Sequence, residues 1–127
     1  MQFVRLKKWL IGLIVTTACS PAPINKETIV LEELSDGTYT GFAHHMNTAE
    51  VEVTLVDHRI ESVRVIRLDA TRFGRPAADS MPARMVREQT PYVDAVSGAT
   101  EASHTLINAT ANALNKAPRK RSLHTER

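Results

Sequence analysis

The sequence is poor in the residue types that several protein classes require. One cysteine in 127 residues excludes an internal disulfide, a four-cysteine zinc site and an iron–sulfur cluster held by the chain's own thiolates. No Cys-x-x-Cys-His spacing occurs, so a c-type haem is excluded as well. Aromatic residues make up only 5% of the chain, against 43% hydrophobic residues. The core must therefore be built mainly from aliphatic side chains.

The chain also lacks an apolar run long enough to cross a membrane. The apolar stretch near its start, Trp9–Ala18, is far short of the roughly 20 residues that a spanning helix needs. Basic residues precede this stretch, and small residues end it. A basic start, a short apolar region and small residues before a cleavage point are the pattern of a secretory signal. We therefore expect residues 1–18 to be a signal peptide.

The single cysteine, Cys19, directly follows Ala18 and resembles the acylated cysteine of bacterial lipoproteins. Several acyl chains would anchor the protein firmly, because each buried CH₂ contributes about 0.8 kcal/mol. Thr16 stands where that pattern usually has leucine, and a plain signal peptide with a stray cysteine is the alternative. We expect an exported, membrane-anchored lipoprotein that faces the periplasm or the cell exterior, with residues 19–35 as a tether.

The formal net charge of +2 hides an uneven distribution of charge. Residues 19–115 hold eight Lys and Arg against thirteen Asp and Glu, a net charge of −5, while basic residues gather at both ends. An acidic body does not suit nucleic acid, so we expect no nucleic-acid partner. The basic end, residues 118–127, is expected to be disordered.

Extended segments are predicted in the middle of the chain. Thr38–His45 is typical of a strand, and Glu50–Leu55 alternates strictly between polar and apolar residues. Asp57–Arg59 is predicted to be a turn, followed by the β-branched segment Ile60–Leu68. These segments form a hairpin or meander, so the sheet is at least partly antiparallel.

Two helical patterns follow the strands. Pro82, just after Ser80, is tolerated at a first helical position, and an apolar stripe then runs to Thr90-Pro91. A longer pattern follows, apolar along one face and ended by Ala117-Pro118. The expected fold class is therefore α+β, with a small, partly antiparallel sheet packed against two or three helices.

The stretch Tyr92–Ser103 joins an apolar run to the longer helical pattern through the small residues Ser97-Gly98-Ala99-Thr100. Such a turn leaves hydroxyls at a helix N-terminus, where free N–H groups and the helix dipole favour a phosphate. The same residues are also typical of an ordinary helix cap, with Thr100 as N-cap and Ser103 completing a weak capping pattern.

This stretch resembles the signature of the FMN-binding domain family, which includes the covalently flavinylated subunits of sodium-pumping NADH:quinone oxidoreductases and of related electron-transport complexes. The signature is an Asp, then Ser/Thr-Gly-Ala-Thr, then a Ser or Thr three residues later. Here these are Asp94, Ser97-Gly98-Ala99-Thr100 and Ser103. Asp36–Gly41 is similar to the family's domain start, and Asn108–Ala117 to its closing helix. The resemblance implies an FMN-binding domain over residues 36–117.

The resemblance further implies that FMN is the cofactor and that Thr100 carries it through a phosphoester, installed from FAD by a flavin transferase. It places five more residues in the cofactor-binding site: Ser97, Gly98, Ala99, Ser103 and Asp94. Gly98 and Ala99 would keep the approach open, and the two serines can donate O–H groups to the phosphate. Asp94 repels phosphate, so it fixes the turn or, as in the family, recruits the transferase's metal.

Because the flavin does the electron chemistry and the protein positions it, we expect an electron carrier rather than an enzyme, with no catalytic residues. Its partners would be a membrane or periplasmic redox protein, within a membrane oxidoreductase system. A lipid-anchored binding module with non-covalent flavin, or none, is the alternative. A serine hydrolase is disfavoured because Ser97 lacks a Gly-x-Ser-x-Gly elbow. A metal site is disfavoured because the adjacent His44 and His45 of a strand point to opposite faces.

Overall fold

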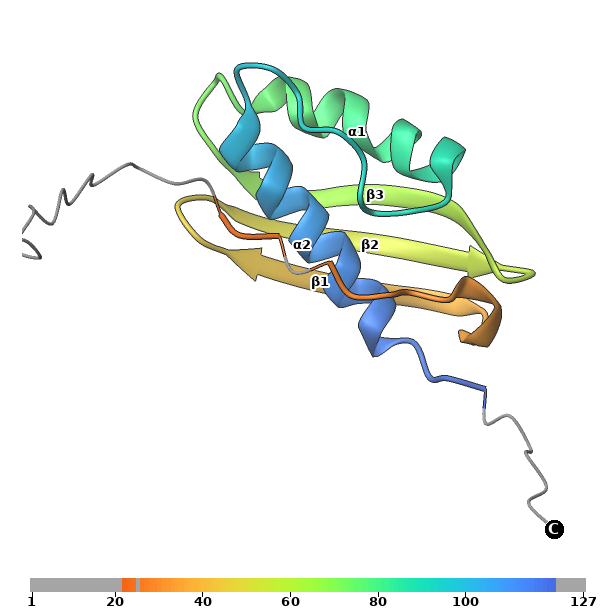
Figure 1. Ribbon diagram of the computed structural model, residues 1–127. Helices are drawn as coiled ribbons and strands as arrows, with labels where there is room; N and C mark the ends of the chain where they lie inside the picture. Colours follow the sequence, from red (N-terminus) through yellow and green to blue (C-terminus); the bar gives the residue numbers. More distant parts are fainter. Residues whose placement is uncertain (1–21, 25, 121–127) are drawn as a thin grey trace, which may run out of the picture.

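A computed structural model of the chain describes residues 22–24 and 26–120 (Figure 1). The elements, in chain order, are η2 (Leu31–Glu33), β1 (Gly37–His44), β2 (Thr48–Val56), β3 (Arg59–Asp69), α1 (Arg75–Glu88) and α2 (Thr100–Lys116). The strands form one sheet in the order β1-β2-β3, and both pairs are antiparallel. The α+β class and the small sheet are thus confirmed, and the sheet is antiparallel throughout rather than in part.

Both long helices pack on one face of the sheet, which makes a two-layer domain. Helix α2 crosses β1 and β2, and α1 packs against β3 and the side of α2 (Figure 1). The alternation predicted for β2 buries one face of that strand, which contributes Ala49, Val51, Val53 and Leu55 to the core. The helices supply Met81, Met85, Leu106 and Leu114. As expected from the scarcity of aromatics, the core is aliphatic.

The turn between β2 and β3 consists of Asp57 and His58, which both have positive φ angles, 50° and 60°. This backbone is that of a two-residue hairpin turn whose twist matches the strands. The Asp36 carboxylate accepts hydrogen bonds from the N–H groups of Asp57 (3.0 Å) and His58 (3.1 Å). Hydrogen bonds from His58 and Asp57 lower the pKa of Asp36. The Asp36 of the predicted domain start therefore holds this turn.

Gly41 lies where β1 and α2 come into backbone contact. A Cβ atom at this position would overlap the carbonyl oxygen of Ala109 and the nitrogen of Ala113, and would lie 2.9 Å from the Cα of Ala113. Backbone atoms cannot move aside as the end of a flexible side chain can. Glycine at position 41 is thus what allows α2 to sit directly on the sheet.

Helix α1 begins at Arg75, earlier than the start predicted near Ser80 and Pro82. Pro76 occupies the first turn, and Pro82 lies inside the helix, where it removes one backbone donor. The Ser80 hydroxyl donates to the Pro76 carbonyl oxygen (2.8 Å). Either proline suits a helix start. The helix starts with the earlier proline, Pro76, because Ala77 in the first turn is fully buried in the core.

The segment expected to be a tether packs on the domain from Ala22 onward, and we call residues 22–34 the strap, of which Asn25 is not described. Ala22 and Leu34, at its two ends, are both buried. Between them, Asn108 donates to the Pro23 carbonyl (2.9 Å) and Asn115 to the Glu27 carboxylate (3.0 Å). The strap thus follows α2 along its length.

The first residues of the expected basic tail are ordered as well. Leu34 forms an isolated antiparallel bridge with Arg119, and the Ser35 N–H donates to the Pro118 carbonyl (2.9 Å). The folded domain therefore extends beyond residues 36–117 on both sides. The predicted signal peptide, Cys19 and residues 121–127 lie outside the described residues. Within the described part, no helix is both long and apolar enough to span a bilayer.

Candidate functional site

The predicted turn leads directly into α2, with Gly98 in the left-handed region at φ 81°. A Cβ atom at Gly98 would meet no atom within 4 Å, so glycine is needed here for its backbone conformation rather than for space. The Ala99 N–H closes the turn on the Val96 carbonyl (2.9 Å). Ala99, not Thr100 as predicted, is the N-cap, and Thr100 is the first residue of the helix.

The N-terminus of α2 presents unused hydrogen-bond donors. The N–H groups of Thr100, Glu101 and Ala102 have no partner among the described residues, and no side chain caps the helix. The Thr100 side chain is exposed beside them. Free N–H groups at the positive end of a 17-residue helix are suited to a phosphate group. Free N–H groups and an exposed hydroxyl therefore lie together at Thr100, which is the arrangement that a phosphate would need.

Ser103 is buried, whereas a residue that binds a phosphate from solution would be exposed. Its side chain is fully buried, its hydroxyl donates to the Ala99 carbonyl (2.7 Å), and its oxygen accepts from the Val96 N–H (2.9 Å). The hydroxyl thus joins both sides of the turn to the second turn of α2. Ser103 fixes the position of Thr100, whereas Ser97 and Asp94 lie exposed in the segment before the helix.

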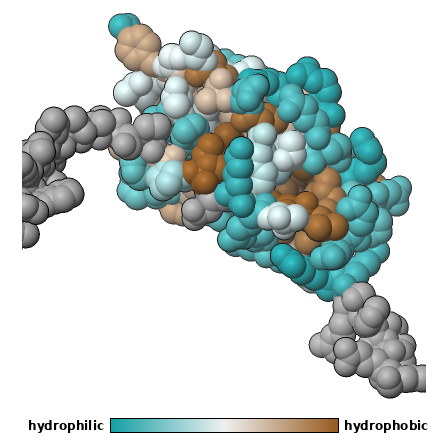
Figure 2. Space-filling model, in the orientation of Figure 1, coloured by the Kyte–Doolittle hydropathy of each residue, from teal (hydrophilic) through white to brown (hydrophobic). Residues whose placement is uncertain are grey.

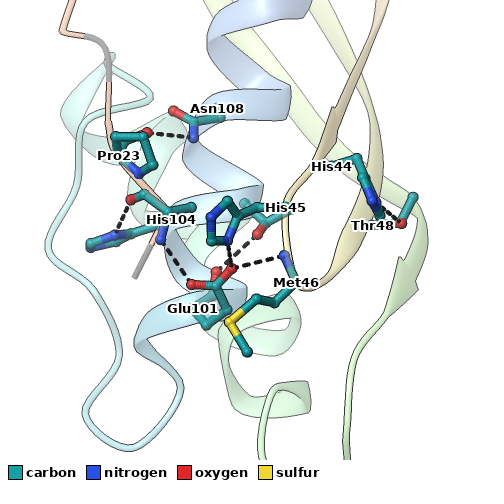
Figure 3. A network of polar contacts seen from close by, with 10 residues as sticks. Pro23, His44, His45, Met46, Thr48, Glu101, His104 and Asn108 are labelled. Atoms are coloured by element: carbon teal, nitrogen blue, oxygen red, sulfur yellow. Dashed lines mark hydrogen bonds and ion pairs between the residues drawn. The ribbon is translucent and has the colours of Figure 1, made fainter. Parts of the chain in front are cut away.

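Glu101 is a residue of this site that the sequence interpretation missed. Its carboxylate accepts hydrogen bonds from the Ala22 N–H (2.8 Å), the His45 Nδ1–H (2.8 Å) and the Met46 N–H (3.3 Å) (Figure 3). One side chain thereby joins the strap, the β1–β2 turn and α2 beside Thr100. The signal in the sequence is an acidic residue in the first turn of a helix. Its partners lie 55 to 79 residues away and could not be deduced.

The Glu101 carboxylate is held in its charged form. Burial raises its pKa, but the hydrogen bonds from Ala22, His45 and Met46 outweigh this, and the pKa lies below the ordinary value of 4.5. A carboxylate with a lowered pKa stabilises the fold above the unfolded-state pKa. That contribution is lost as the pH falls through the folded-state pKa.

We expect Glu101→Ala to lower the free energy of unfolding at pH 7 by roughly 1–3 kcal/mol, because the N–H donors of Ala22, His45 and Met46 lose a charged acceptor. The deficit relative to the unmodified protein should shrink as the pH falls below about 4.5. Urea denaturation across this pH range measures both effects. Glu88→Ala, which removes an exposed glutamate of α1, is the matched control and should show neither. A deficit that does not change with pH would mean that packing, not charge, is the contribution of Glu101.

Two exposed apolar side chains flank the first turn of α2. Met46 follows the His45 that binds Glu101, and Phe73 comes from the loop between β3 and α1. That loop is packed against α2, since a Cβ atom at Gly74 would lie 3.0 Å from the Cβ of Ala102. The guanidinium of Arg72 lies 5.0 Å from the centre of the Phe73 ring. The site therefore combines free N–H groups with exposed apolar side chains.

The histidines near the site have separate hydrogen-bond partners. His44 bonds to Thr48 Oγ1 (2.8 Å) and His104 donates to the Ala22 carbonyl (2.8 Å), while His45 binds Glu101. Among residues 22–24 and 26–120, no three His, Cys, Asp or Glu side chains are grouped so as to hold a metal ion.

Comparison with known proteins agrees with this geometry. A sequence model of the FMN-binding domain matches residues 45–115, more than half of the chain, and the match includes the turn and α2 up to Asn115. A search of curated proteins found no match. Among solved structures, the crystal structure of the CPE2226 protein from Clostridium perfringens is similar, with a TM-score of 0.54 and 15% identity. The similarity covers 66% of this chain and 88% of that one. At this identity, the likeness shows the fold alone.

Proposed function

The chain belongs to the FMN-binding domain family and FMN is its cofactor, and from this we propose that it is an extracytoplasmic, lipid-anchored electron carrier with FMN joined to Thr100 by a phosphoester. The observation that carries the proposal is the exposed Thr100 hydroxyl beside three unpartnered N–H groups of α2. Ser103 holds the turn from within the core, so the hydroxyl stands on a fixed support. The export and anchoring parts of the proposal come from residues 1–19.

Attachment requires a flavin transferase that uses FAD. The bond from Thr100 Oγ1 to phosphorus forms as the bond between the two phosphates of FAD breaks. AMP leaves, and the hydroxyl proton passes to a base of the transferase. The N–H groups at the start of α2 offset the charge of the phosphate. Asp94, exposed in the preceding loop, is positioned for contact with the transferase and its metal.

Bound FMN supplies one- or two-electron exchange, and this chain's own residues bind and orient it. The charged Glu101, in the first turn of α2 beside Thr100, accepts a hydrogen bond from the Met46 N–H. Because the turn is at the surface, a membrane or periplasmic redox partner can approach directly. This arrangement supports a carrier that exchanges electrons with proteins or membrane components.

The proposal is tested by co-expression with a flavin transferase, followed by denaturation. Flavin fluorescence should stay with the chain in a denaturing gel. The added mass of an FMN group should appear on the tryptic peptide from Glu88 to Lys116, which contains Thr100. Flavin that separates from the chain on denaturation would support the alternative of a non-covalent module. A colourless protein, made beside an active transferase, would support a domain without flavin.

A further inference from the structure

We propose that the end of the domain that carries Thr100 docks on the surface of the lipid bilayer. The inference rests on the anchor at Cys19 from the proposed function, but not on covalent flavin. The chain enters the fold at this end, because Ala22 is 3% exposed and fixed to the first turns of α2. Its N–H donates to Glu101 (2.8 Å) and its carbonyl accepts from His104 (2.8 Å) (Figure 3).

The distance between anchor and fold is short. Only Ser20 and Pro21 separate Cys19 from Ala22. Since a chain spans at most about 3.5 Å per residue, an acylated Cys19 lies within roughly 11 Å of Ala22. Strand β3 has eleven residues, so the sheet is about 35 Å long. The end with the β2–β3 turn therefore cannot face the bilayer, whereas the end with Thr100 is kept close to it.

The surface at this end has the composition of a bilayer-binding surface. Of the large apolar side chains in the described part, Phe73 (64%) and Met46 (63%) are the most exposed, and both belong to it. The exposed Arg72 and Arg75 accompany them. Apolar side chains enter the headgroup region, and arginines near anionic lipid add electrostatic attraction. Three acidic groups at the same end oppose them: Asp94, Glu101 and Asp69. Glu101 is paired with His45, and Asp69 with Arg67.

The other faces of the domain are less suited to binding a partner. The outer face of the sheet carries the exposed Phe42, but polar side chains surround it, such as Glu50 opposite it and the Glu52–Arg64 ion pair (2.9 Å). On the face formed by α2 and the strap, brown apolar areas are broken up by polar residues (Figure 2). Apolar surface divided in this way does not suit a large protein interface. The bilayer is therefore the partner that both the tether length and the exposed groups favour.

The orientation is tested on the full lipidated chain with single labels. In an acylated protein an introduced cysteine is the only free thiol, because Cys19 is the sole native cysteine. Thr71→Cys labels the proposed docking end, and Arg59→Cys labels the opposite end; both positions are exposed. Each fluorescent protein is reconstituted in phosphatidylethanolamine–phosphatidylglycerol vesicles that contain a nitroxide headgroup lipid. We expect the label at position 71 to lose most of its fluorescence and the label at position 59 to keep it.

A variant with a longer tether distinguishes docking on the bilayer from the proximity that a short tether alone would impose. Inserting about twenty Gly and Ser residues before Ala22 gives a flexible spacer of roughly 25 Å. Quenching at position 71 should persist in this variant and be lost when Phe73→Asp is added. Equal quenching of the two labels, or loss of quenching with the spacer alone, overturns the docking surface. Two free thiols per chain, with protein in the soluble fraction, would instead show that Cys19 is not acylated. That result overturns the anchor and the orientation together, whereas flavin attachment is measured separately.

Discussion

Replacing Thr100 by valine is expected to abolish covalent flavin and to leave the domain folded. Valine keeps the branched shape but has no hydroxyl, so no phosphoester can form. Thr100 is not the N-cap, and in the first turn of an exposed helix end a valine costs only about 0.5 kcal/mol. In-gel flavin fluorescence after co-expression with a flavin transferase should fall to background. Circular dichroism should be unchanged, so the loss of flavin cannot be attributed to unfolding.

Two control variants make this test specific. Thr100→Ser keeps a hydroxyl with a freer rotamer and should retain partial labelling. Thr71→Val removes an exposed hydroxyl at the same end of the domain and should retain full labelling. Covalent flavin that persists on the folded Thr100→Val protein would show that another residue is the acceptor.

Gly41→Ala is expected to have the largest effect on stability. The new methyl group would overlap backbone atoms of Ala109 and Ala113 and so force α2 away from the sheet. Overpacking against side chains lowers the free energy of unfolding by about 1–3 kcal/mol. Because backbone atoms cannot repack, we expect Gly41→Ala to lower it by about 3 kcal/mol or more. For a domain of this size, the midpoint of thermal unfolding should fall by on the order of 15 °C.

Gly98→Ala is the control for this change. Its methyl group would meet no atom within 4 Å, so only the strain of a left-handed alanine remains, about 1 kcal/mol. Thermal unfolding followed by circular dichroism compares the two variants. If Gly41→Ala is no less stable than Gly98→Ala, the close approach of β1 and α2 is not what restricts position 41 to glycine.

The parts of the fold that follow from local patterns could be predicted from the sequence. Strict alternation in residues 50–55 predicted the buried face of β2. The turn predicted at Asp57–Arg59, before a β-branched segment, indicated the hairpin, although Arg59 already belongs to β3. The tight turn that leads into α2 could also be predicted. Glycine and small hydroxyl residues before a helical pattern indicate such a turn from the local sequence alone.

The parts that depend on contacts between distant residues could not be predicted. Glu101 was missed because its partners, Ala22 and His45, lie in two other segments. The strap looked like a linker because a few prolines and small residues do not reveal that a helix will bury them. Ser103 was predicted to donate its O–H to the phosphate, but its hydroxyl holds the turn instead, a role that only its burial reveals. The start of α1 was misplaced because two prolines satisfied the same local rule.

The proposed anchor at Cys19 would give the strap a mechanical role. Tension on the chain before Ala22 acts first on its hydrogen bonds to Glu101 and His104. The bond between Pro23 and Asn108 is loaded only after these have opened, so the strap peels from α2 in steps at low force. The ladders of β1, β2 and β3 bear no load meanwhile. Peeling would stop at Leu34, where the Arg119 bridge ties the strap to the far end of the domain, and slackening would let it re-dock.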